Sequence, residues 1–336
     1  MTTSVNTLLD VRDLHVEFRT REGVAKAVNG VSYSVDAGET LAVLGESGSG
    51  KSVTAQAIMG ILDTPPGFVR HGEILFKGTD LLRMSAGERR KVRGAHMAMI
   101  FQDALSALNP VLSVGDQLGE MFVVHRGMSR KDAKIRAVEL MDRVRIPAAR
   151  ERVGQYPHQF SGGMRQRIMI AMAIALEPEL IIADEPTTAL DVTVQAQVME
   201  LLAELRRELR MGLILITHDL GVVADAADKI AVMYAGRIVE TAHVHEIYRR
   251  PAHPYTKGLL ESIPRLDQKG RQLSAIKGLP PSLLRIPPGC AFHPRCPLAQ
   301  QVCRTDEPPL YELHEAGPGR RSACHFWKEC LGEHGT

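Results

Sequence analysis

Eight consecutive residues, Gly45–Ser52, follow the pattern G-x-x-x-x-G-K-S, which is typical of a loop that binds phosphate groups. The apolar run Thr40–Leu44 before the loop predicts a buried strand, and Val53–Met59 after it can form a helix. Small residues let backbone N–H groups converge on a polyphosphate, and a helix start adds the positive end of its dipole. Lys51 can reach the β- and γ-phosphates, and the Ser52 hydroxyl can hold Mg²⁺. The alternative is a Gly/Ser-rich turn that happens to end in Lys-Ser. The residues predicted to contact the bound molecule here are Gly45, Glu46, Ser47, Gly48, Ser49, Gly50, Lys51, Ser52 and Val53.

Two carboxylates follow a second apolar run. Leu180–Ala183 predicts a buried strand, and Asp184 and Glu185 lie at its carboxyl end, the edge at which open α/β sheets bind ligands. Asp184 suits the ligand shell of Mg²⁺, and Glu185 suits a general base that orients an attacking water. Alone, these residues are also compatible with an ordinary Asp-Glu-Pro turn. Together with a phosphate loop, they favour a hydrolytic site.

His218 and Gln102 each follow a further predicted strand. His218 comes after Leu213–Thr217, where a histidine can donate a hydrogen bond to a γ-phosphate and respond to its loss. Gln102 comes after Met97–Phe101 and can contact Mg²⁺ or water while moving with the segment that follows it. A lone histidine after a strand is usually structural, so both assignments depend on the phosphate loop.

Ser161 is predicted to cap a helix that begins with Gly162 and Gly163. Two glycines leave the backbone N–H groups of this helix start bare, and such a start is an anion site. The site lies far along the chain from the phosphate loop, in a different predicted subdomain. The two can serve one nucleotide only if they come from different subunits, which predicts a head-to-tail dimer. The alternative is an ordinary capped helix.

The elements that must position these residues indicate an α/β fold. Strands and helices alternate before and after a helical segment of about residues 103–176, which predicts a mostly parallel sheet of the P-loop NTPase (RecA-like) type carrying a helical subdomain. Residues 8–35 are predicted to be extended, as an N-terminal antiparallel segment, and residues 72–76 to form a strand. From residue 251 the chain holds 12 of the 19 prolines and all five cysteines. We therefore predict domains at 1–250 and 251–336, the second small and rich in loops.

Composition narrows the classes of function. The chain of 336 residues is 44% hydrophobic and 24% charged, enough for a sizeable core, and it has no disordered or fibrous character. The net charge of +2 gives no support to a nucleic-acid or anionic-lipid binder. Met1–Thr7 has no signal-peptide pattern, and no apolar run approaches the roughly 20 residues of a membrane helix. The chain by itself is expected to be soluble and cytoplasmic.

The order and spacing of these motifs across residues 8 to about 245 resemble the nucleotide-binding domain of ABC transporters. The resemblance rests on Gly45–Ser52, Gln102, Ser161–Gly163, the segment Thr188-Ala189-Leu190-Asp191 with the Asp184-Glu185 pair before it, and His218. It implies ATP and Mg²⁺ as cofactors, with Ser52, Gln102 and Asp184 around the metal. It also implies that Phe18 stacks on adenine, that Asp191 belongs to the loop that crosses between subunits, and that Gln102 couples the site to a membrane partner. Lys51, Gln102, Glu185 and His218 would be the catalytic residues.

The motif around Ser161–Gly163 is the signature motif of this family. It departs from the common sequence Leu-Ser-Gly-Gly-Gln by having Phe160 and Met164. This variant, with Asn109-Pro110 and the segment Arg250–Thr256, is similar to the ATPase subunit of bacterial dipeptide and oligopeptide importers. The resemblance implies two integral-membrane permeases, a second and related ATPase subunit, an extracytoplasmic substrate-binding protein, and a peripheral position on the cytoplasmic side of the inner membrane.

Four of the five cysteines, all but Cys330, have the spacing C-x5-C-x6-C-x20-C. An odd number of cysteines in a reducing compartment favours metal over disulfides, but the spacing lacks the short knuckles of structural zinc sites. An iron–sulfur cluster, zinc with His293 or His325, and free thiols all stay open. The similarity to peptide-importer ATPases implies a [4Fe–4S] cluster on Cys290, Cys296, Cys303 and Cys324.

Two other functions deserve comparison with peptide import. Importers of nickel, glutathione or antimicrobial peptides share this architecture, and the ATPase does not touch the cargo. A soluble ABC ATPase acting on DNA or ribosomes is a more distant alternative. Such proteins carry long coiled coils or two tandem ATPase domains, and this chain has neither pattern.

Overall fold

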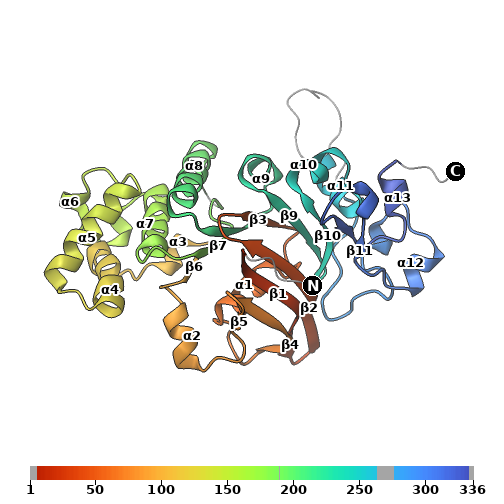
Figure 1. The fold of residues 1–336 in the computed structure, drawn as a ribbon, viewed down its shortest axis with the longest axis horizontal. Coiled ribbons are helices and arrows are strands. Elements are labelled where there is room, and N and C mark those ends of the chain that lie inside the picture. The colour runs from red at the N-terminus through yellow and green to blue at the C-terminus, as the bar shows by residue number, and fades with distance from the viewer. Residues whose placement is uncertain (1–5, 189, 263–275, 333–336) are drawn as a thin grey trace. The chain divides into compact units, whose positions relative to one another are not determined.

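The computed structural model describes residues 6–188, 190–262 and 276–332, and the chain divides into two compact units (Figure 1). The first unit contains Val35–Glu39 and Arg83–Ile216 together with the described residues before Leu9. The second contains Leu9–Ser34, Thr40–Leu82 and the described residues from Thr217 onward. Each unit is therefore assembled from segments that are far apart in the sequence.

Three parallel strands, in the order β8-β7-β6, form the sheet of the first unit. They are β6 (Met97–Ile100), β7 (Leu180–Asp184) and β8 (Gly212–Ile216), and every residue in them is buried. Strands of a parallel sheet are covered on both faces, so their sequences are continuous apolar runs rather than alternating ones. The predicted parallel strands are confirmed here.

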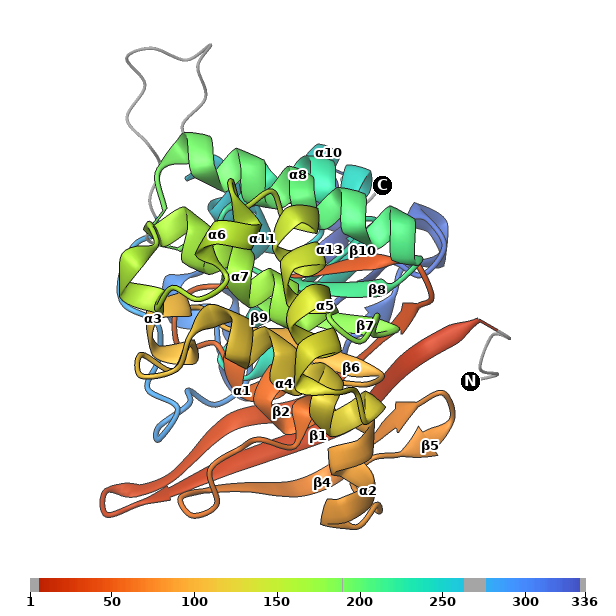
Figure 2. The ribbon, with the colours of Figure 1, turned by 90° about the vertical axis from the view of Figure 1, so that its left-hand side faces the viewer.

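Helices account for the rest of the first unit. No strand occurs among the residues between β6 and β7, which confirms the predicted helical segment. Figure 2 shows α4, α5 and α7 side by side, and α7 contacts both β6 and α8. The helices are α2 (Ala86–Val92), α3 (Ala104–Ala107), α4 (Val114–Arg126), α5 (Arg130–Arg143), α6 (Ala149–Arg152), the 3-10 helix η1 (Pro157–Gln159), α7 (Gly162–Ile174) and α8 (Val192–Leu209).

Helix α2 has no counterpart among the expected elements. None of its residues is buried, so the sequence Ala86–Val92 lacks the apolar stripe that reveals an amphipathic helix. Its start is fixed by a capping box instead. The backbone N–H of Glu88 donates to Ser85 Oγ at 3.3 Å, and Ser85 N–H donates to Glu88 Oε2 at 2.8 Å.

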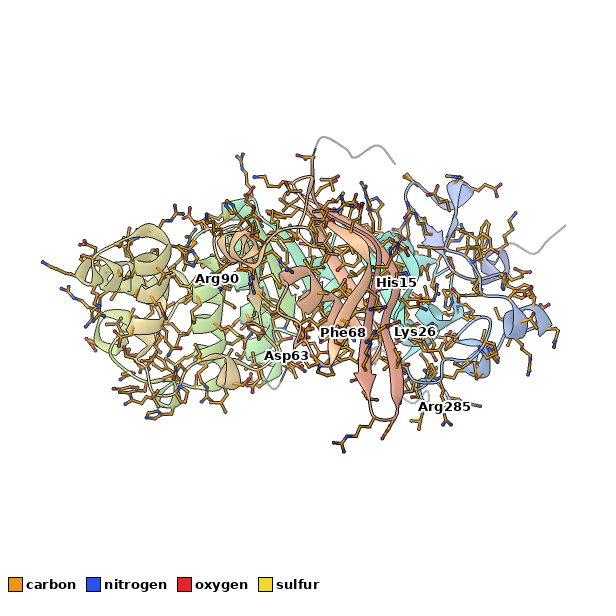
Figure 3. The ribbon with its side chains drawn as sticks, turned by 90° about the horizontal axis from the view of Figure 1, so that it is seen from below. His15, Lys26, Asp63, Phe68, Arg90 and Arg285 are labelled. Carbon is orange, nitrogen blue, oxygen red and sulfur yellow. The ribbon has the colours of Figure 1, made fainter. Side chains whose placement is uncertain are left out.

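The second unit contains an antiparallel sheet in the order β2-β1-β4-β5. Its strands are β1 (Thr7–Thr20), β2 (Gly23–Asp36), β4 (Gly67–Phe76) and β5 (Thr79–Asp80). Figure 3 labels His15, Lys26 and Phe68, which lie on β1, β2 and β4. The predicted N-terminal antiparallel segment is therefore confirmed.

Strand β4 begins five residues earlier than the predicted strand at 72–76, and Gly72 lies in its interior. Gly72 has a φ of +112°, and a Cβ there would lie 2.7 Å from the backbone oxygen of Asp13. The register of β1 against β4 shifts between Arg12 and His15, opposite this glycine. A glycine that looks like a strand boundary in the sequence is thus the site of a bulge, where only a residue without a side chain fits.

A second sheet of this unit has the order β11-β12-β10-β9-β3, with β3 and β9 parallel. Its strands are β3 (Thr40–Leu44), β9 (Lys229–Tyr234), β10 (Arg237–His243), β11 (Tyr311–Glu312) and β12 (Arg321–Ser322). The helices of the unit are α1 (Lys51–Met59), α9 (Leu220–Ala226), α10 (Val244–Arg249), α11 (Pro254–Glu261), α12 (Gln301–Thr305) and α13 (Trp327–Cys330), with the 3-10 helices η2 (His293–Arg295) and η3 (His314–Ala316).

The region from residue 251 onward packs against β9 and β10 around aromatic side chains. Tyr255 is fully buried, and its ring centroid lies 4.6 Å from that of Tyr234 and 5.4 Å from that of Phe292. Aromatic pairs at such distances add to the stabilisation that burial itself provides. The helices and strands of this region are only two to eight residues long, as expected for a loop-rich region.

Buried polar groups complete this packing. Glu240 on β10 is fully buried, 3.7 Å from Arg320, and its Oε1 accepts the backbone N–H of Ala252 at 2.6 Å. Burial raises the pKa of Glu240 to about 7 and lowers the pKa of His253 to about 3. His253 is therefore neutral at physiological pH, and its Nδ1 accepts the N–H of Tyr255 at 3.1 Å, capping α11.

Among the helices in the described parts of the chain, none combines the length and the apolar character that a membrane-spanning segment requires.

Candidate functional site

The phosphate loop connects β3 to α1, the strand-to-helix context that its motif requires. Gly45 and Gly50 have φ values of +154° and +102°. A Cβ on Gly45 would lie 2.3 Å from the carbonyl oxygen of Met233, and one on Gly50 would lie 2.3 Å from that of Ala27. Both glycines are thus required by the close approach of backbone from β9 and β2.

Two side chains in this loop fit a bound polyphosphate. Lys51 is 6% exposed, and its Nζ donates to the carbonyl oxygens of Gly45 at 2.8 Å and Glu46 at 3.0 Å. The Ser49 hydroxyl is buried and has no hydrogen-bond partner among the described residues. The Ser49 hydroxyl and the Lys51 ammonium can both donate to a ligand with many oxygen acceptors, and the two glycines keep side chains out of this space. Ser52 and Val53 follow in the first turn of α1.

His218 and Phe18 belong to the same unit as the loop. The N–H of Thr217 donates to the carbonyl oxygen of Val43, two residues before the loop, at 3.3 Å. This bond brings the exposed His218, the next residue, near the end of β3. Phe18 is half-buried on β1 opposite Gly67, and its stacking role stays a prediction.

Glu185 is the centre of a hydrogen-bond network in the first unit. Its Oε2 accepts from Gln102 Nε2 at 2.9 Å and from Thr188 Oγ1 at 2.9 Å. The residue has a φ of +46°, which is unfavourable for a side chain of this size, and its N–H is tied to Ile216 O at 2.8 Å. Strain of this kind concentrates at functional sites, where surrounding bonds hold it in place. The carboxylate that the sequence singles out is therefore held in one orientation.

Asp184 occupies the last position of β7 opposite Ile216 and is 5% exposed. Asp184 and Glu185 lie in the first unit, whereas the phosphate loop and His218 lie in the second. The side-chain oxygen atoms of Asp184, Ser52 and Gln102 are of the kind that Mg²⁺ prefers, so the chemistry of each of these side chains suits that ion.

The second predicted anion site, Ser161–Gly163, opens helix α7. Ser161 is its N-cap, and Ser161 Oγ accepts the N–H of Met164 at 3.3 Å, as expected. A Cβ on Gly163 would lie 2.6 Å from Val194 Cγ1, so this glycine also lets α7 approach α8. Asp191 caps α8, and its Oδ1 accepts from Val194 N at 2.9 Å. The start of α7, which carries the signature motif, therefore packs against the start of α8, which Asp191 caps. Ala189 lies outside the described residues.

The four predicted cysteine ligands line one small cavity, although 34 positions separate the first from the last. Cys290, Cys296, Cys303 and Cys324 share it with Phe292 and three histidines, His253, His293 and His325. The N–H of Cys290 donates to the carbonyl oxygen of Cys303 at 2.9 Å, which ties two of the segments together. Tertiary packing therefore gathers thiols that the sequence leaves apart.

Three of these thiols, those of Cys290, Cys296 and Cys324, have a pKa above the ordinary value. Burial raises the pKa of Cys290 to about 11 and that of Cys296 to about 12. A hydrogen bond with Cys330 and burial raise the pKa of Cys324, which gives the leftover cysteine a partner. In the described parts of the chain, no group of three or more His, Cys, Asp or Glu side chains has the geometry to hold a metal ion. The predicted cluster therefore has its four residues in one place but no ready-made ligand set.

One ion pair at the phosphate loop was not predicted from the sequence. Arg295 Nη1 lies 2.6 Å from Glu46 Oε2, across 249 positions of sequence. The hydroxyl of Tyr255 also accepts the backbone N–H of Glu46 at 2.8 Å. No local pattern marks either residue, since both act through the fold. The available signal in the sequence was Glu46, an acidic residue in a loop made mostly of small residues.

Two family models match the chain. The model described as "ABC transporter" matches residues 28–188, and the model described as "Oligopeptide/dipeptide transporter, C-terminal region" matches residues 239–303. The first match contains the phosphate loop, Gln102 and the two strand-end carboxylates. The second contains three of the four cavity cysteines and Arg295.

Similar curated proteins cover almost all of the chain. The oligopeptide transport ATP-binding protein OppD of Bacillus subtilis is 52% identical over 93% of this chain and 87% of its own length. The dipeptide transport ATP-binding protein DppD of the same organism is 55% identical over 88% of each chain, and OppD of Salmonella typhimurium is 50% identical over 95% of this chain and 93% of its own.

Solved structures agree with the fold. An ATP-binding cassette seen as a dimer after hydrolysis, bound to ADP and phosphate, is 26% identical, with a TM-score of 0.63 over 70% of this chain and 98% of its own. The cbiO1 protein of Clostridium perfringens, part of an ABC transporter complex, is 28% identical, with a TM-score of 0.61 over 72% of this chain and 91% of its own.

Proposed function

The chain belongs to the ATP-binding subunits of ABC transporters for oligopeptides and dipeptides, and from this premise we propose how its residues bind and hydrolyse ATP. The protein is an ATPase that supplies energy for peptide import. The observation that carries the proposed mechanism is the Glu185 carboxylate, which accepts hydrogen bonds from both Gln102 and Thr188.

ATP is bound by the phosphate loop, Gly45–Val53. Backbone N–H groups and Lys51 bind the β- and γ-phosphates, and Phe18 stacks on the adenine ring. Ser52, Gln102 and Asp184 would hold Mg²⁺, which when bound neutralises charge that develops on the phosphates.

Hydrolysis is an in-line attack of water on the γ-phosphorus. Glu185 orients the water and accepts its proton as the new P–O bond forms and the bond to the β-phosphate oxygen breaks, which yields ADP and phosphate. Lys51 and His218 stabilise the transferring phosphoryl group. Gln102 bonds the same carboxylate and precedes the helical segment, so it reports the state of the site to a membrane partner.

A head-to-tail pair of ATPase subunits completes each site. Ser161–Gly163, with Ser161 and Gly162 exposed at the start of α7, and Asp191 would contact ATP bound to the opposite subunit. We infer that the second ATPase is a related chain, that both bind two integral-membrane permeases on the cytoplasmic face of the membrane, and that an extracytoplasmic binding protein delivers the peptide. The proposed ATP-binding domain is residues 1–250, through which the pair would form. The proposed C-terminal domain is residues 251–336, whose described part belongs to the same compact unit as β9 and β10.

A Glu185→Gln substitution tests the mechanism. The amide cannot accept the proton of water, so kcat for ATP should fall at least about 100-fold while the Kd for ATP changes little. The matched control is Glu179→Gln, because Glu179 directly precedes the same strand at its other end, bonded to His96 on the surface. ATP turnover and fluorescent-nucleotide binding would be measured on both. Near-normal turnover in Glu185→Gln would remove Glu185 from the mechanism.

We further propose that Cys290, Cys296, Cys303 and Cys324 bind a [4Fe–4S] cluster, with zinc as the alternative. Support comes from their position around one cavity. Because metal and cluster ligands are thiolates, loading would release protons and weaken as the pH falls. A cluster gives iron and sulfide in roughly equal amounts, about four of each per chain, with broad visible absorbance. Anaerobic preparations of wild type and of Cys303→Ser would be compared with Cys330→Ser, which should keep the cluster. Stoichiometric zinc, or no metal, would exclude it.

A further inference from the structure

We propose that Arg295, in the C-terminal region, is a positioning residue for ATP because it neutralises Glu46 inside the phosphate loop. This inference rests on the assignment of Gly45–Val53 as the ATP site. Arg295 lies outside the sequence motifs of the ATP-binding domain, and it has one task. The task is to remove the charge penalty that an acidic loop residue imposes on a polyphosphate.

The ion pair has the geometry of a strong one. Arg295 Nη1 lies 2.6 Å from Glu46 Oε2, and Nη2 lies 2.9 Å from Oε1, so the guanidinium and the carboxylate form two parallel hydrogen bonds. The Arg295 side chain is only 5% exposed, and that of Glu46 is 27% exposed. Shielding from water strengthens this pair relative to the exposed ion pairs elsewhere on the surface.

Arg295 is held in place independently of Glu46. Its Nε donates to the carbonyl oxygen of Lys277 at 3.1 Å. Its guanidinium carbon lies 5.8 Å from the ring centroid of Tyr234 and 6.0 Å from that of Phe292. These cation–π contacts and the backbone acceptor keep the charge pointed at the loop, so removal of the Glu46 carboxylate would not release the arginine.

The same region also fixes the backbone of the loop. The N–H of Glu46 donates to the hydroxyl of Tyr255, a fully buried residue of α11 whose ring packs on Tyr234. The second residue of the phosphate loop is therefore bound to the C-terminal region through its main chain and its side chain at once.

The electrostatic role follows from where Glu46 lies. The loop gathers N–H groups and Lys51 around several negative phosphate oxygens, and a carboxylate in that loop opposes them. Arg295 cancels the opposing charge. The hydrogen bonds that Arg295 donates to Glu46 raise the pKa of Arg295 above its ordinary value, so the guanidinium is charged at physiological pH. Without Arg295, Glu46 would keep its charge next to the phosphates, partly shielded from water.

The experiment is a double-mutant cycle on the full chain. Arg295→Gln should raise the Kd for ATP about tenfold, with kcat in the permease-bound complex changed by less than about threefold. Adding Glu46→Gln to Arg295→Gln removes the uncompensated charge and should return the Kd to within about threefold of wild type. Arg295→Lys keeps the charge but cannot form the two parallel hydrogen bonds, so its Kd for ATP should lie between those of wild type and Arg295→Gln. Arg321→Gln is the matched control, because it removes an ion pair with Glu312 in the same region, away from the loop.

Each outcome decides the proposal. Wild-type affinity in Arg295→Gln would overturn it, and so would a double variant that binds ATP as weakly as Arg295→Gln, because that result means a purely structural role. If Arg295→Gln does not fold, the same comparison is made between Arg295→Lys and Glu46→Gln/Arg295→Lys. Lys51→Ala separates this inference from the site assignment: if Lys51→Ala binds ATP normally, the loop itself is not the ATP site.

Discussion

The phosphate loop and the cysteine cavity gather their groups in opposite ways. The loop uses eight consecutive residues, and its pattern is legible without any knowledge of the fold. The cavity collects four thiols from separate segments, which only the packing around Tyr255 and Phe292 brings together. Yet the loop also depends on distant partners, since Met233, Ala27 and Arg295 all limit or hold it. A local motif states which groups bind, and the tertiary contacts decide whether they are in position.

The largest expected effect tests that dependence. Gly50→Ala places a Cβ 2.3 Å from Ala27 O on β2, at a φ of +102°. Overpacking and backbone strain together should cost about 3 kcal/mol, which corresponds to roughly 100-fold weaker ATP binding if the loop yields. Gly38→Ala is the control, because Gly38 has a φ of +76° but nothing within 4 Å of a Cβ. The Kd for ATP would be measured by nucleotide titration of both variants. Equal affinities would contradict the dependence of the loop on its distant neighbours.

A glycine in the first unit extends the test to the signature helix. Gly163→Ala brings a Cβ to 2.6 Å from Val194 Cγ1, and overpacking of this kind costs roughly 1–3 kcal/mol of unfolding free energy. Gly162→Ala, whose nearest contact is at 3.8 Å, should be neutral or stabilising. Adding Val194→Ala should recover the loss. Denaturant unfolding measures all three, and equal midpoints for the two glycine variants would contradict close packing as the reason for Gly163.

The cavity region is tested by pH. Burial lowers the pKa of His253 to about 3, so between pH 6.5 and 3 the unfolded chain binds a proton that the folded chain does not. The contribution of His253 to stability is therefore complete above pH 6.5 and falls as the pH decreases, by about 2 kcal/mol from pH 7 to pH 5. His253→Asn keeps a capping residue for α11 and should lose this decrease.

The measurement is the difference in unfolding free energy between the two pH values, wild type against variant. Glu240, with its raised pKa of about 7, contributes the opposite slope in both proteins and cancels in the comparison. An unchanged pH dependence in His253→Asn would mean that the buried ring does not govern acid stability.

The smallest effect concerns the polar network of the first unit. Gln102→Ala removes one donor to the Glu185 carboxylate and leaves the Thr188 hydroxyl at 2.9 Å. Loss of one such bond should lower kcat about tenfold with the KM for ATP nearly unchanged. Gln197→Ala, which removes a surface bond to Arg167, is the control. A rise in KM without a fall in kcat would assign Gln102 to binding rather than to the orientation of Glu185.

Much of this architecture is predictable because its signals are local. Buried parallel strands are continuous apolar runs, so β7 and β8 are located to within a residue, and Ser161 marks the start of α7. Helix α2 escapes because it buries nothing, and Gly72 misleads because bulges and strand ends both favour glycine.

The remaining parts of the site could not be predicted, for one physical reason. Arg295 and the pairing of Cys330 with Cys324 are contacts between segments distant in sequence or without a periodic pattern. A sequence shows which side chains are available, but their neighbours are set by the packing of the whole unit.

The pair formed by Glu46 and Arg295 also has a consequence for the timing of synthesis. The two residues are 249 positions apart, and a ribosome adds about 5–20 residues per second, so the arginine is made roughly 12–50 seconds after the loop that it neutralises. During that interval the nascent chain carries a phosphate loop whose acidic residue is unbalanced. Unfinished chains should therefore compete poorly for cellular ATP, and nucleotide capture becomes a property of the nearly completed polypeptide.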